Sequence, residues 1–541
     1  MSKKLPRALL FVISFNVAFL LYSSSVRGLP IWDDLPYWFF DPAMKPDVSY
    51  LSIWRSYGWP FSISVQKLAF GLWKNQYAFY HVFNFCLHFL NSYLVYLLGK
   101  RLRLRSPFLY FLLFLLHPAC VISVAWMIQI KTLLCFTFAL AALLCYLEGR
   151  RGTRWLAASW VFFFLSVTSK SASLPLPLIF LALSFRSRCF KKQALLLPFF
   201  LIAAWSGHRV LSSEVTQQGV EMAALSTTFK EIPEPGDAPV AVHVPSEAKK
   251  ETLAPAPSGI SQLLVFRREP TERTFFTDIL PGVYRYFYHL ARESQKLAAS
   301  PQGSGPVETV PAPTAFVSSL QIPSFEKIKI NVVLTAQTLR YYFWHSLLPT
   351  QTEPVKGLNF NQLQLQDVFH LAFLVLFVGF FWRDPLLSFL LAAHLLLLPF
   401  VGLIPAPFMN VTWVSDQHLY LVLPALIGFW LKLWERIPGR FAAVVPGVYL
   451  LLFSLGTWRA VHWYKDEFAF YETSLERNPL NAPIAYNLAY AYLKHDRWVD
   501  AYNVMEGIVL LAKHEPLLRK NVYYPHIEFL YQRMTRLMED S

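Results

Sequence analysis

Apolar runs of about the length that crosses a bilayer alternate along most of the chain with short polar turns. The first run, Ala8–Val26, is almost wholly apolar, and a helix of about 20 such residues spans the hydrocarbon core. About ten further spans are expected near residues 81–98, 107–124, 129–147, 155–169, 174–185, 194–206, 366–381, 386–404, 418–434 and 441–457. The pattern predicts an all-α integral membrane protein with about eleven transmembrane helices.

Basic residues between the apolar runs indicate how the helices are oriented. Lysines and arginines gather at 100–105, 148–151 and 186–192, and such clusters mark cytoplasmic turns. The turns between them are therefore expected to be extracytoplasmic. We interpret the run Asn331–Pro349 as interfacial, because a span there would move the later basic turns outside. The C-terminal tail then lies on the extracytoplasmic side.

Composition divides the chain into four parts. Residues 1–210 form an N-terminal membrane core with its first outer loop, and residues 326–458 form a second membrane part. Between them, residues 211–325 contain PEPG, APAPSG and PQGSGP, which predicts a flexible periplasmic insert. Residues 459–541 are soluble in character and are expected to form a small helical tail.

The tail carries a pattern of small and large apolar residues typical of a tetratricopeptide helix pair. The matching residues are Ala485, Leu488, Ala489, Tyr492 and Ala501. A generic helical hairpin is the alternative. Flanking helices at about 466–477 and 515–538 are expected to cover its apolar faces.

Composition supports a membrane protein and argues against other classes. The chain is 55% hydrophobic and only 15% charged, whereas about a quarter of the residues in soluble domains are charged. The net charge of +15 follows the positive-inside pattern, so nucleic acid is not an expected partner. All five cysteines lie in or beside apolar segments, which favours neither a disulfide framework nor a zinc site. The basic start, Met1–Arg7, predicts an uncleaved anchor with a cytoplasmic N-terminus.

Trp32-Asp33-Asp34 follows the first span and is the main candidate for chemistry. Carboxylates at a membrane boundary cost several kcal/mol if they are buried unpaired. Asp33 and Asp34 either begin a solvated loop or form an acid pair that faces a cavity. The second span carries a stripe of polar residues at helical spacing, which should point into the bundle: His81, Asn84, His88 and Asn91. Interhelical hydrogen bonding explains most of this stripe, and His81, nearest the outer surface, is its site candidate.

Cationic and titratable residues recur at the predicted outer turns. They are His117, which precedes a helix-breaking proline, Lys131, Lys170, Arg340, Asp416 and His418. Lys131 either snorkels to the interface or faces an anionic ligand. Several cations beside carboxylates suit a phosphate-bearing lipid donor, because the cations can hold the phosphate while an Asp takes the acceptor's proton. A transporter would also gather charges, although usually nearer the bilayer midplane.

Six blocks in order carry a family resemblance. They are WDD, HVFNFCLHFLN, HPACVISVAWMIQIKTLL, TSKSASLPL, SDQHLYLVLP and TWRAVHWYKDEFAFYETSLERNPLNAPIAYNLA. With them the chain resembles the GT-C membrane glycosyltransferases, in particular the tetratricopeptide-bearing protein O-mannosyltransferase-like group and its bacterial relatives. The resemblance implies an enzyme of a bacterial inner membrane that transfers a sugar from a polyprenyl-phosphate carrier to a periplasmic protein or glycan.

That resemblance also implies roles for residues. Asp33 or Asp34 would be the catalytic base. From their charge and their position at the outer turns, we expect seven further residues to bind substrate: His81, His117, Lys131, Lys170, Arg340, Asp416 and His418. The tail would recruit the acceptor. No cofactor is expected with certainty, although an adjacent Asp pair could hold a divalent cation.

Three charged positions of the family pattern are missing here. Ile122 stands where an acid is typical, and Ile130 and Thr132 replace an Arg and an Asp. Trp59 replaces an Arg before Pro60, and Ser415-Asp416-Gln417-His418 replaces Ala-Asp-Arg-Tyr. The alternative is therefore a catalytically inactive membrane scaffold that recruits partners through its tail.

Overall fold

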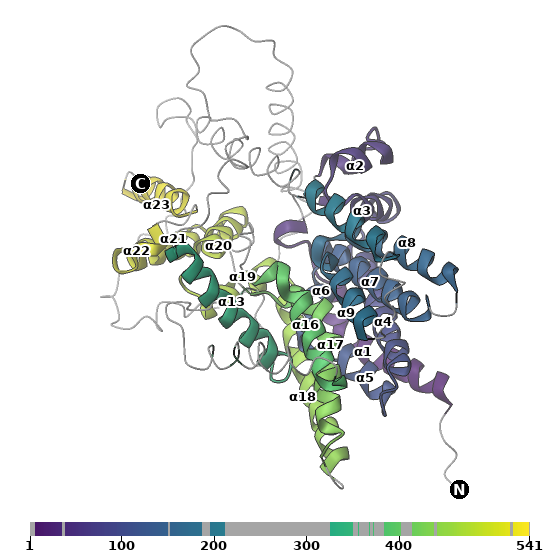
Figure 1. Cartoon of the computed structure of the whole chain (residues 1–541). Coiled ribbons are helices and arrows are strands. Elements are labelled where there is room, and N and C mark those ends of the chain that lie inside the picture. Colours follow the sequence, from purple (N-terminus) through teal and green to yellow (C-terminus); the bar gives the residue numbers. More distant parts are fainter. Residues whose placement is uncertain are drawn as a thin grey trace. The chain divides into compact units, whose positions relative to one another are not determined.

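The computed structural model describes residues 6–34, 38–39, 41–149, 152–186, 195–210, 325–349, 384–401, 414–437, 441–519 and 523–539, with a few isolated positions. Throughout these residues the only regular structure is helical, as expected (Figure 1). The chain divides into two compact units, residues 1–211 with 323–528, and residues 212–322 with 529–541. The first unit carries everything that follows except the residues from 529 on. The predicted insert at 211–325 lies almost wholly outside the described residues.

The expectation of eleven spans is wrong for the described residues. Four helical stretches there are long and apolar enough to cross a membrane: α1 (Arg7–Val26), α4 (Tyr77–Arg101), Met127–Glu148 and Val444–Tyr464. The third consists of η5 (Met127–Gln129) and α7 (Ile130–Glu148), and the fourth covers most of α18 (Phe441–Val461) and η15 (His462–Tyr464). A fifth is possible if Pro107–Leu115 and Pro118–Ala125 form one span, bent by 56°.

The structure shows why the other predicted spans are not among the stretches that could cross a membrane. α9 (Leu176–Arg186) and α16 (Pro385–Leu397), with 11 and 13 residues, are shorter than a bilayer requires. α8 (Thr153–Ser169) has 17 residues, fewer than any of the four stretches. α17 (Asp416–Trp434) begins with three polar residues, which lower its hydrophobicity. Residues 197–210 are helical but too few, and the span at 366–381 lies almost wholly outside the described residues. The run interpreted as interfacial, 331–349, begins in α13 (Phe325–His345) and extends four residues beyond it, and α13 is not among the apolar stretches.

The polar stripe of α4 is buried, as predicted, and it joins helices that are distant in sequence. His88 Nδ1 lies 2.8 Å from the Tyr420 hydroxyl of α17, and Asn91 Nδ2 donates to the Leu133 carbonyl of α7 at 3.2 Å. α4 also packs against α1 and α5 (Pro107–Leu115), while α17 packs against α5, α7 and α16 (Figure 1). The bend after α5 confirms the break predicted at His117-Pro118.

One end of the bundle collects the basic turns. Arg101 Nε lies 3.2 Å from Glu148 Oε1, so the ends of α4 and α7 meet there. The Arg105 amide donates to Glu435 Oε1 at 3.1 Å, which brings the end of α17 to the same place. The opposite end of the bundle carries η1 (Trp32–Asp34), the start of α7 and the end of α8.

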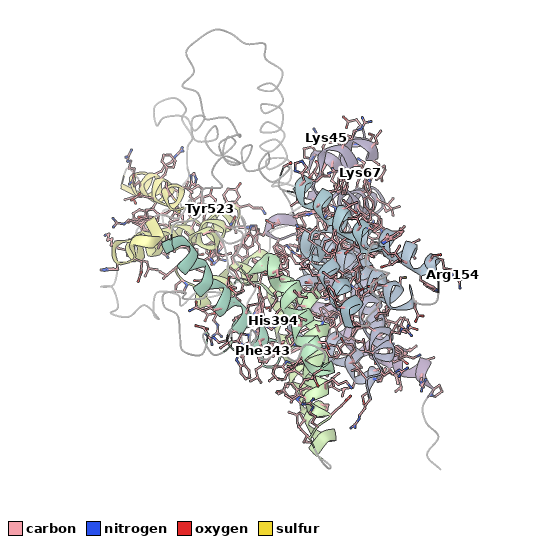
Figure 2. All side chains as sticks on the ribbon, viewed as in Figure 1. Lys45, Lys67, Arg154, Phe343, His394 and Tyr523 are labelled. Carbon is pink, nitrogen blue, oxygen red and sulfur yellow. The ribbon has the colours of Figure 1, made fainter. Side chains whose placement is uncertain are left out.

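The segment that joins α1 to α4, which we call the outer segment, contains η3 (Pro42–Met44), α2 (Tyr50–Ser56) and α3 (Pro60–Trp73). Figure 2 labels two of its lysines, Lys45 and Lys67, together with Arg154 in the first turn of α8. Lys67 Nζ donates to the Ala43 carbonyl at 2.8 Å, so α3 is fastened to η3.

The tail is helical throughout its described residues. It comprises α19 (Glu467–Arg477), α20 (Ala482–Lys494), α21 (Trp498–His514), α22 (Pro516–Arg519) and α23 (Tyr524–Glu539). α20 packs on both α19 and α21. The residues predicted for the tetratricopeptide pattern are each at most 1% exposed: Ala485, Leu488, Ala489, Tyr492 and Ala501.

Candidate functional site

Asp34 closes a small turn after the first span. Its amide donates to the Ile31 carbonyl at 3.0 Å, and the Ile31 amide donates back to Asp34 Oδ2 at 2.9 Å. The other carboxylate oxygen, Oδ1, accepts from the Ile128 amide at 2.8 Å. Asp34 is fully buried, and each of its oxygens accepts a backbone hydrogen bond.

The Asp34 carboxylate provides a hydrogen-bond acceptor at a break between two neighbouring helices. Between α6 (Val121–Ala125) and α7 the backbone becomes extended at Trp126, which leaves amides and carbonyls without helical partners. Asn84 Nδ2 of α4 lies 3.2 Å from both the Trp126 and the Met127 carbonyl oxygens. Asp34 satisfies the Ile128 amide from the other side, so it has a structural role independent of any chemistry.

The two aspartates occupy different environments. Burial raises the pKa of Asp34 to about 8, opposed by its two backbone hydrogen bonds and by Lys131. Asp33 keeps part of its surface accessible. Its negative charge acts on both Lys131, in α7, and Lys170, between α8 and η7, so Asp33 lies near both cations. The accessible acid beside the lysines is Asp33.

Lys170 lies between α8 and η7 (Ser171–Ser173) and is only 8% exposed. Its Nζ donates to Thr132 Oγ1 at 2.8 Å and lies 3.4 Å from Gln417 Oε1, so α7, α8 and α17 meet at this amine. Burial, followed by the positive charge of Lys131, lowers the pKa of Lys170 to about 7. Lys131 Nζ stands 5.4 Å from the centre of the Trp59 ring, in the outer segment.

A second polar group lies at the kink after α5. His345 Nε2 is 3.0 Å from Asp416 Oδ1, and both side chains are buried. His117 Nε2 lies 3.0 Å from the Ser346 carbonyl oxygen, while its Nδ1 accepts from the Ala119 amide at 3.1 Å. Both ring nitrogens of His117 therefore take part in fixing the kink and η4 (Pro118–Cys120).

Three predicted site residues remain: His418, Arg340 and His81. They either connect the two polar groups or lie apart from them. His418 Nδ1 is 3.3 Å from the Tyr342 hydroxyl, and the charges of Lys170 and Asp416 both act on it. Arg340 Nε pairs with the buried carboxylate of Asp367. His81 packs against Gly28, where an added Cβ would stand 3.2 Å from His81 Nε2 and 2.8 Å from the Ser25 carbonyl oxygen.

Trp32 connects the region of Asp33 and Asp34 to the C-terminal tail. Its backbone φ of 44° is unusual for a non-glycine residue and costs about 1–3 kcal/mol. The ring stacks on Trp126 at a centroid distance of 6.0 Å and meets Phe470 of α19 edge-on at 5.7 Å. Burial raises the pKa of Tyr471, and the negative charges of Glu467, Asp33 and Asp34 raise it further. The first tail helix therefore packs on Trp32, the residue that precedes the acid pair.

Sequence reasoning missed three partners in this region. Thr132 and Gln417 hold Lys170, and His345 pairs with Asp416. Thr132 lies three residues after Gln129 and donates to Gln129 Oε1 at 2.6 Å, a helical spacing that the sequence already contained. Nothing local to Gln417 or His345 indicated their partners. In the described residues, no group of three or more His, Cys, Asp or Glu could hold a metal ion, and a divalent cation remains only a prediction.

Residues 470–502 match the family model of the tetratricopeptide repeat, which covers α20 with parts of α19 and α21. This match confirms the repeat predicted in the tail. Repeats of this kind mediate contacts between proteins in general. No curated protein and no solved structure matches the chain.

Proposed function

We propose that the protein is a membrane glycosyltransferase that transfers a sugar from a polyprenyl-phosphate donor to a protein or glycan. Asp33 serves as the base that takes the acceptor's proton, and Lys131 and Lys170 receive the donor phosphate. The observation that carries the proposal is the partly exposed Asp33, whose negative charge acts on Lys131 and Lys170, at one end of a bundle of apolar helices.

The chemistry of these groups supports the assignment. A sugar leaves a polyprenyl phosphate as the phosphate takes up negative charge, and cations in a water-poor site stabilise that charge. An acceptor hydroxyl must lose a proton as it attacks, and a carboxylate within reach can accept it. Asp34 does not compete for this role, because backbone amides occupy both of its oxygens. We assign Asp34 to positioning η1 and Asp33 to catalysis.

The direct test uses the full chain reconstituted in vesicles with a panel of polyprenyl-phosphate hexoses and small hydroxyl acceptors. Release of polyprenyl phosphate together with sugar incorporation supports the proposal. Failure to release polyprenyl phosphate from any donor, with a folded protein, contradicts it. The location proposed for the protein is a bacterial inner membrane with the tail in the periplasm, and protease protection of the tail in spheroplasts and inverted vesicles checks that orientation.

Lys170 predicts how transfer depends on pH. Because the pKa of Lys170 is lowered to about 7, its amine is cationic below that pH and neutral above it. We expect kcat/KM for the donor, which reports the free enzyme, to fall above about pH 7 by up to tenfold per unit. Lys170→Arg should move this fall to higher pH, because a guanidinium stays charged.

The control for this profile is Lys45→Arg, which alters an exposed amine in the outer segment. Its pH profile should match that of the wild type. If kcat/KM of Lys170→Arg falls at the same pH as that of the wild type, Lys170 does not belong to the donor site.

The alternative is a scaffold without catalysis, favoured by the tetratricopeptide repeat and by the apolar residues Ile122 and Ile130, which are at most 5% exposed. Mutations in the contact between α19 and Trp32 distinguish an enzyme from a scaffold. Phe470→Ala removes the ring beside Trp32 and Trp126, and we expect it to lower kcat for a small acceptor by about tenfold with little change in KM.

Trp498→Ala, which alters an exposed tail residue, should leave transfer to small acceptors unchanged. If the tail only recruits partners, Phe470→Ala will behave like Trp498→Ala in this assay. A scaffold also requires that no variant of Asp33 changes the function of the protein in cells.

A further inference from the structure

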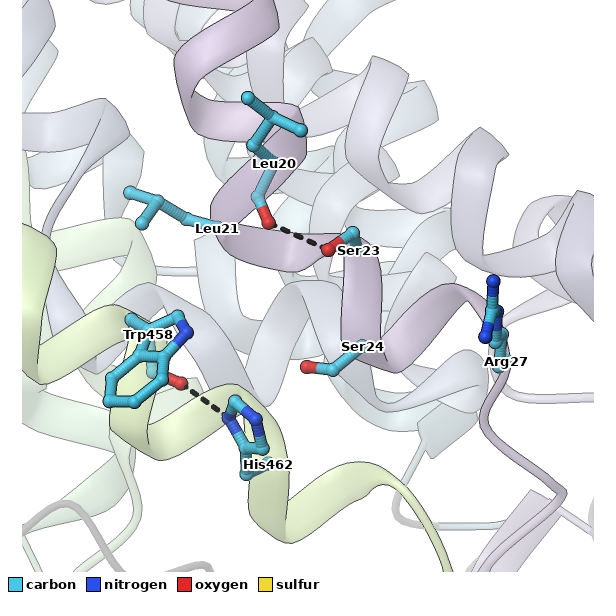
Figure 3. Close-up of a pocket in the computed structure, with 7 residues that line it drawn as sticks. All are labelled: Leu20, Leu21, Ser23, Ser24, Arg27, Trp458 and His462. Atoms are coloured by element: carbon cyan, nitrogen blue, oxygen red, sulfur yellow. Dashed lines mark hydrogen bonds between the residues drawn. The ribbon is translucent and has the colours of Figure 1, made fainter.

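A cavity of about 310 Å³ opens between the last turns of α1 and α18, and the proposed reaction does not use it (Figure 3). Leu20, Leu21 and Trp458 form its apolar part. Ser24, Arg27 and His462 contribute its polar groups, and Figure 3 shows Trp458 and His462 across the gap from Ser24.

Both helices lead to this cavity along exposed apolar stripes. On α1 the exposed side chains recur at helical spacing: Leu9, Val12, Ile13, Val17 and Leu20. On α18 they are Val444, Val448, Leu451, Leu452, Leu455 and Trp458. α1 and α18 pack together, and each belongs to a stretch that could cross a membrane. Acyl chains can lie along these stripes, which places the cavity at the level of the lipid head groups.

The polar wall has unused hydrogen-bonding capacity. Ser24 Oγ is buried and has no hydrogen-bond partner. In the part of the chain that the structure describes, no carboxylate pairs with Arg27. His462 Nδ1 donates to the Trp458 carbonyl oxygen at 2.8 Å, so Nε2 of the neutral ring remains an acceptor.

These groups match one kind of ligand. A guanidinium and a hydroxyl donor suit the single negative charge of a phosphodiester. The free His462 Nε2 can accept a hydrogen bond from a hydroxyl on the same head group. Two neighbouring apolar stripes suit a lipid with two acyl chains. We propose that this cavity binds the head group of an anionic glycerophospholipid with a hydroxylated head group, such as phosphatidylglycerol, from the surrounding bilayer.

The test measures lipid retention by the purified full chain with native mass spectrometry, after equilibration with defined lipids. The wild type should retain phosphatidylglycerol in preference to phosphatidylcholine. Arg27→Gln should weaken that retention by about tenfold, since it removes a charge-assisted hydrogen bond. Arg27→Lys should retain part of the preference because the positive charge remains. Arg55→Gln, at another exposed arginine of the outer segment, should bind as the wild type does.

Three results would overturn the proposal. Equal retention by the wild type and Arg27→Gln would show that the cavity does not select the lipid. Displacement by glycerol 3-phosphate at concentrations similar to those of the lipid would indicate a site for free phosphate. Preferential retention of polyprenyl phosphate would assign the cavity to the donor lipid. If Arg27→Gln does not fold, Ser24→Val serves as the test variant. It removes the unpaired hydroxyl and should also weaken lipid retention.

Discussion

Asp33→Asn is expected to lower sugar transfer by at least about 100-fold, the usual scale for loss of a general base. The amide has nearly the shape of the carboxylate but cannot take a proton from the acceptor. Because Asp33 is partly exposed, the melting temperature should stay close to that of the wild type. Initial rates of polyprenyl phosphate release, together with melting curves in detergent, measure both effects.

Asp47→Asn is the matched control, since Asp47 is an exposed acid in the same outer segment. It should retain the wild-type rate. Wild-type transfer by Asp33→Asn would contradict its role as base.

Asp34→Asn should have the opposite signature, with lost stability as its primary effect. Asp34 accepts the Ile31 amide on one oxygen and the Ile128 amide on the other. An asparagine offers one oxygen and one NH₂ group, so one buried backbone amide will face another donor. We expect the free energy of unfolding to fall by about 1–3 kcal/mol.

Asp34 also predicts a pH dependence of stability. Burial raises its pKa from 3.8 to about 8, so between these values the folded state binds a proton that the unfolded state has lost. Stability contributed by this group should therefore decline as pH rises through that window. Asp34→Asn should remove that decline, and melting curves between about pH 4 and about pH 9 test it. A variant with wild-type stability and an unchanged pH profile would contradict the structural role.

Much of the local organisation was predictable from the chain itself. The spacing of His81, Asn84, His88 and Asn91 indicated a buried face, because residues three and four apart share one side of a helix. Pro118 indicated the kink because it cannot continue the hydrogen bonds of a helix. The tetratricopeptide repeat was also predictable, because its pattern of small and large apolar residues is local in sequence.

The number of spans was predicted less well. Apolar runs such as 155–169 and 174–185 predict crossings, although the helices they form are shorter than the four stretches that could cross a membrane. Hydrophobicity reports that a segment avoids water, and it does not report whether lipid or the remainder of the protein provides the apolar surroundings.

By itself, the sequence determined an all-helical chain with several apolar helices, a proline kink, a repeat in the tail and an acid pair after the first apolar run. Only the tertiary structure distinguished Asp33 from Asp34, because the deciding Ile128 amide lies 94 residues away. It likewise brought Gln417 to Lys170 across 247 residues and placed Phe470 on Trp32. Helical periodicity reaches only a few residues along the chain, whereas burial and hydrogen bonding of a charged group depend on which distant segments pack around it.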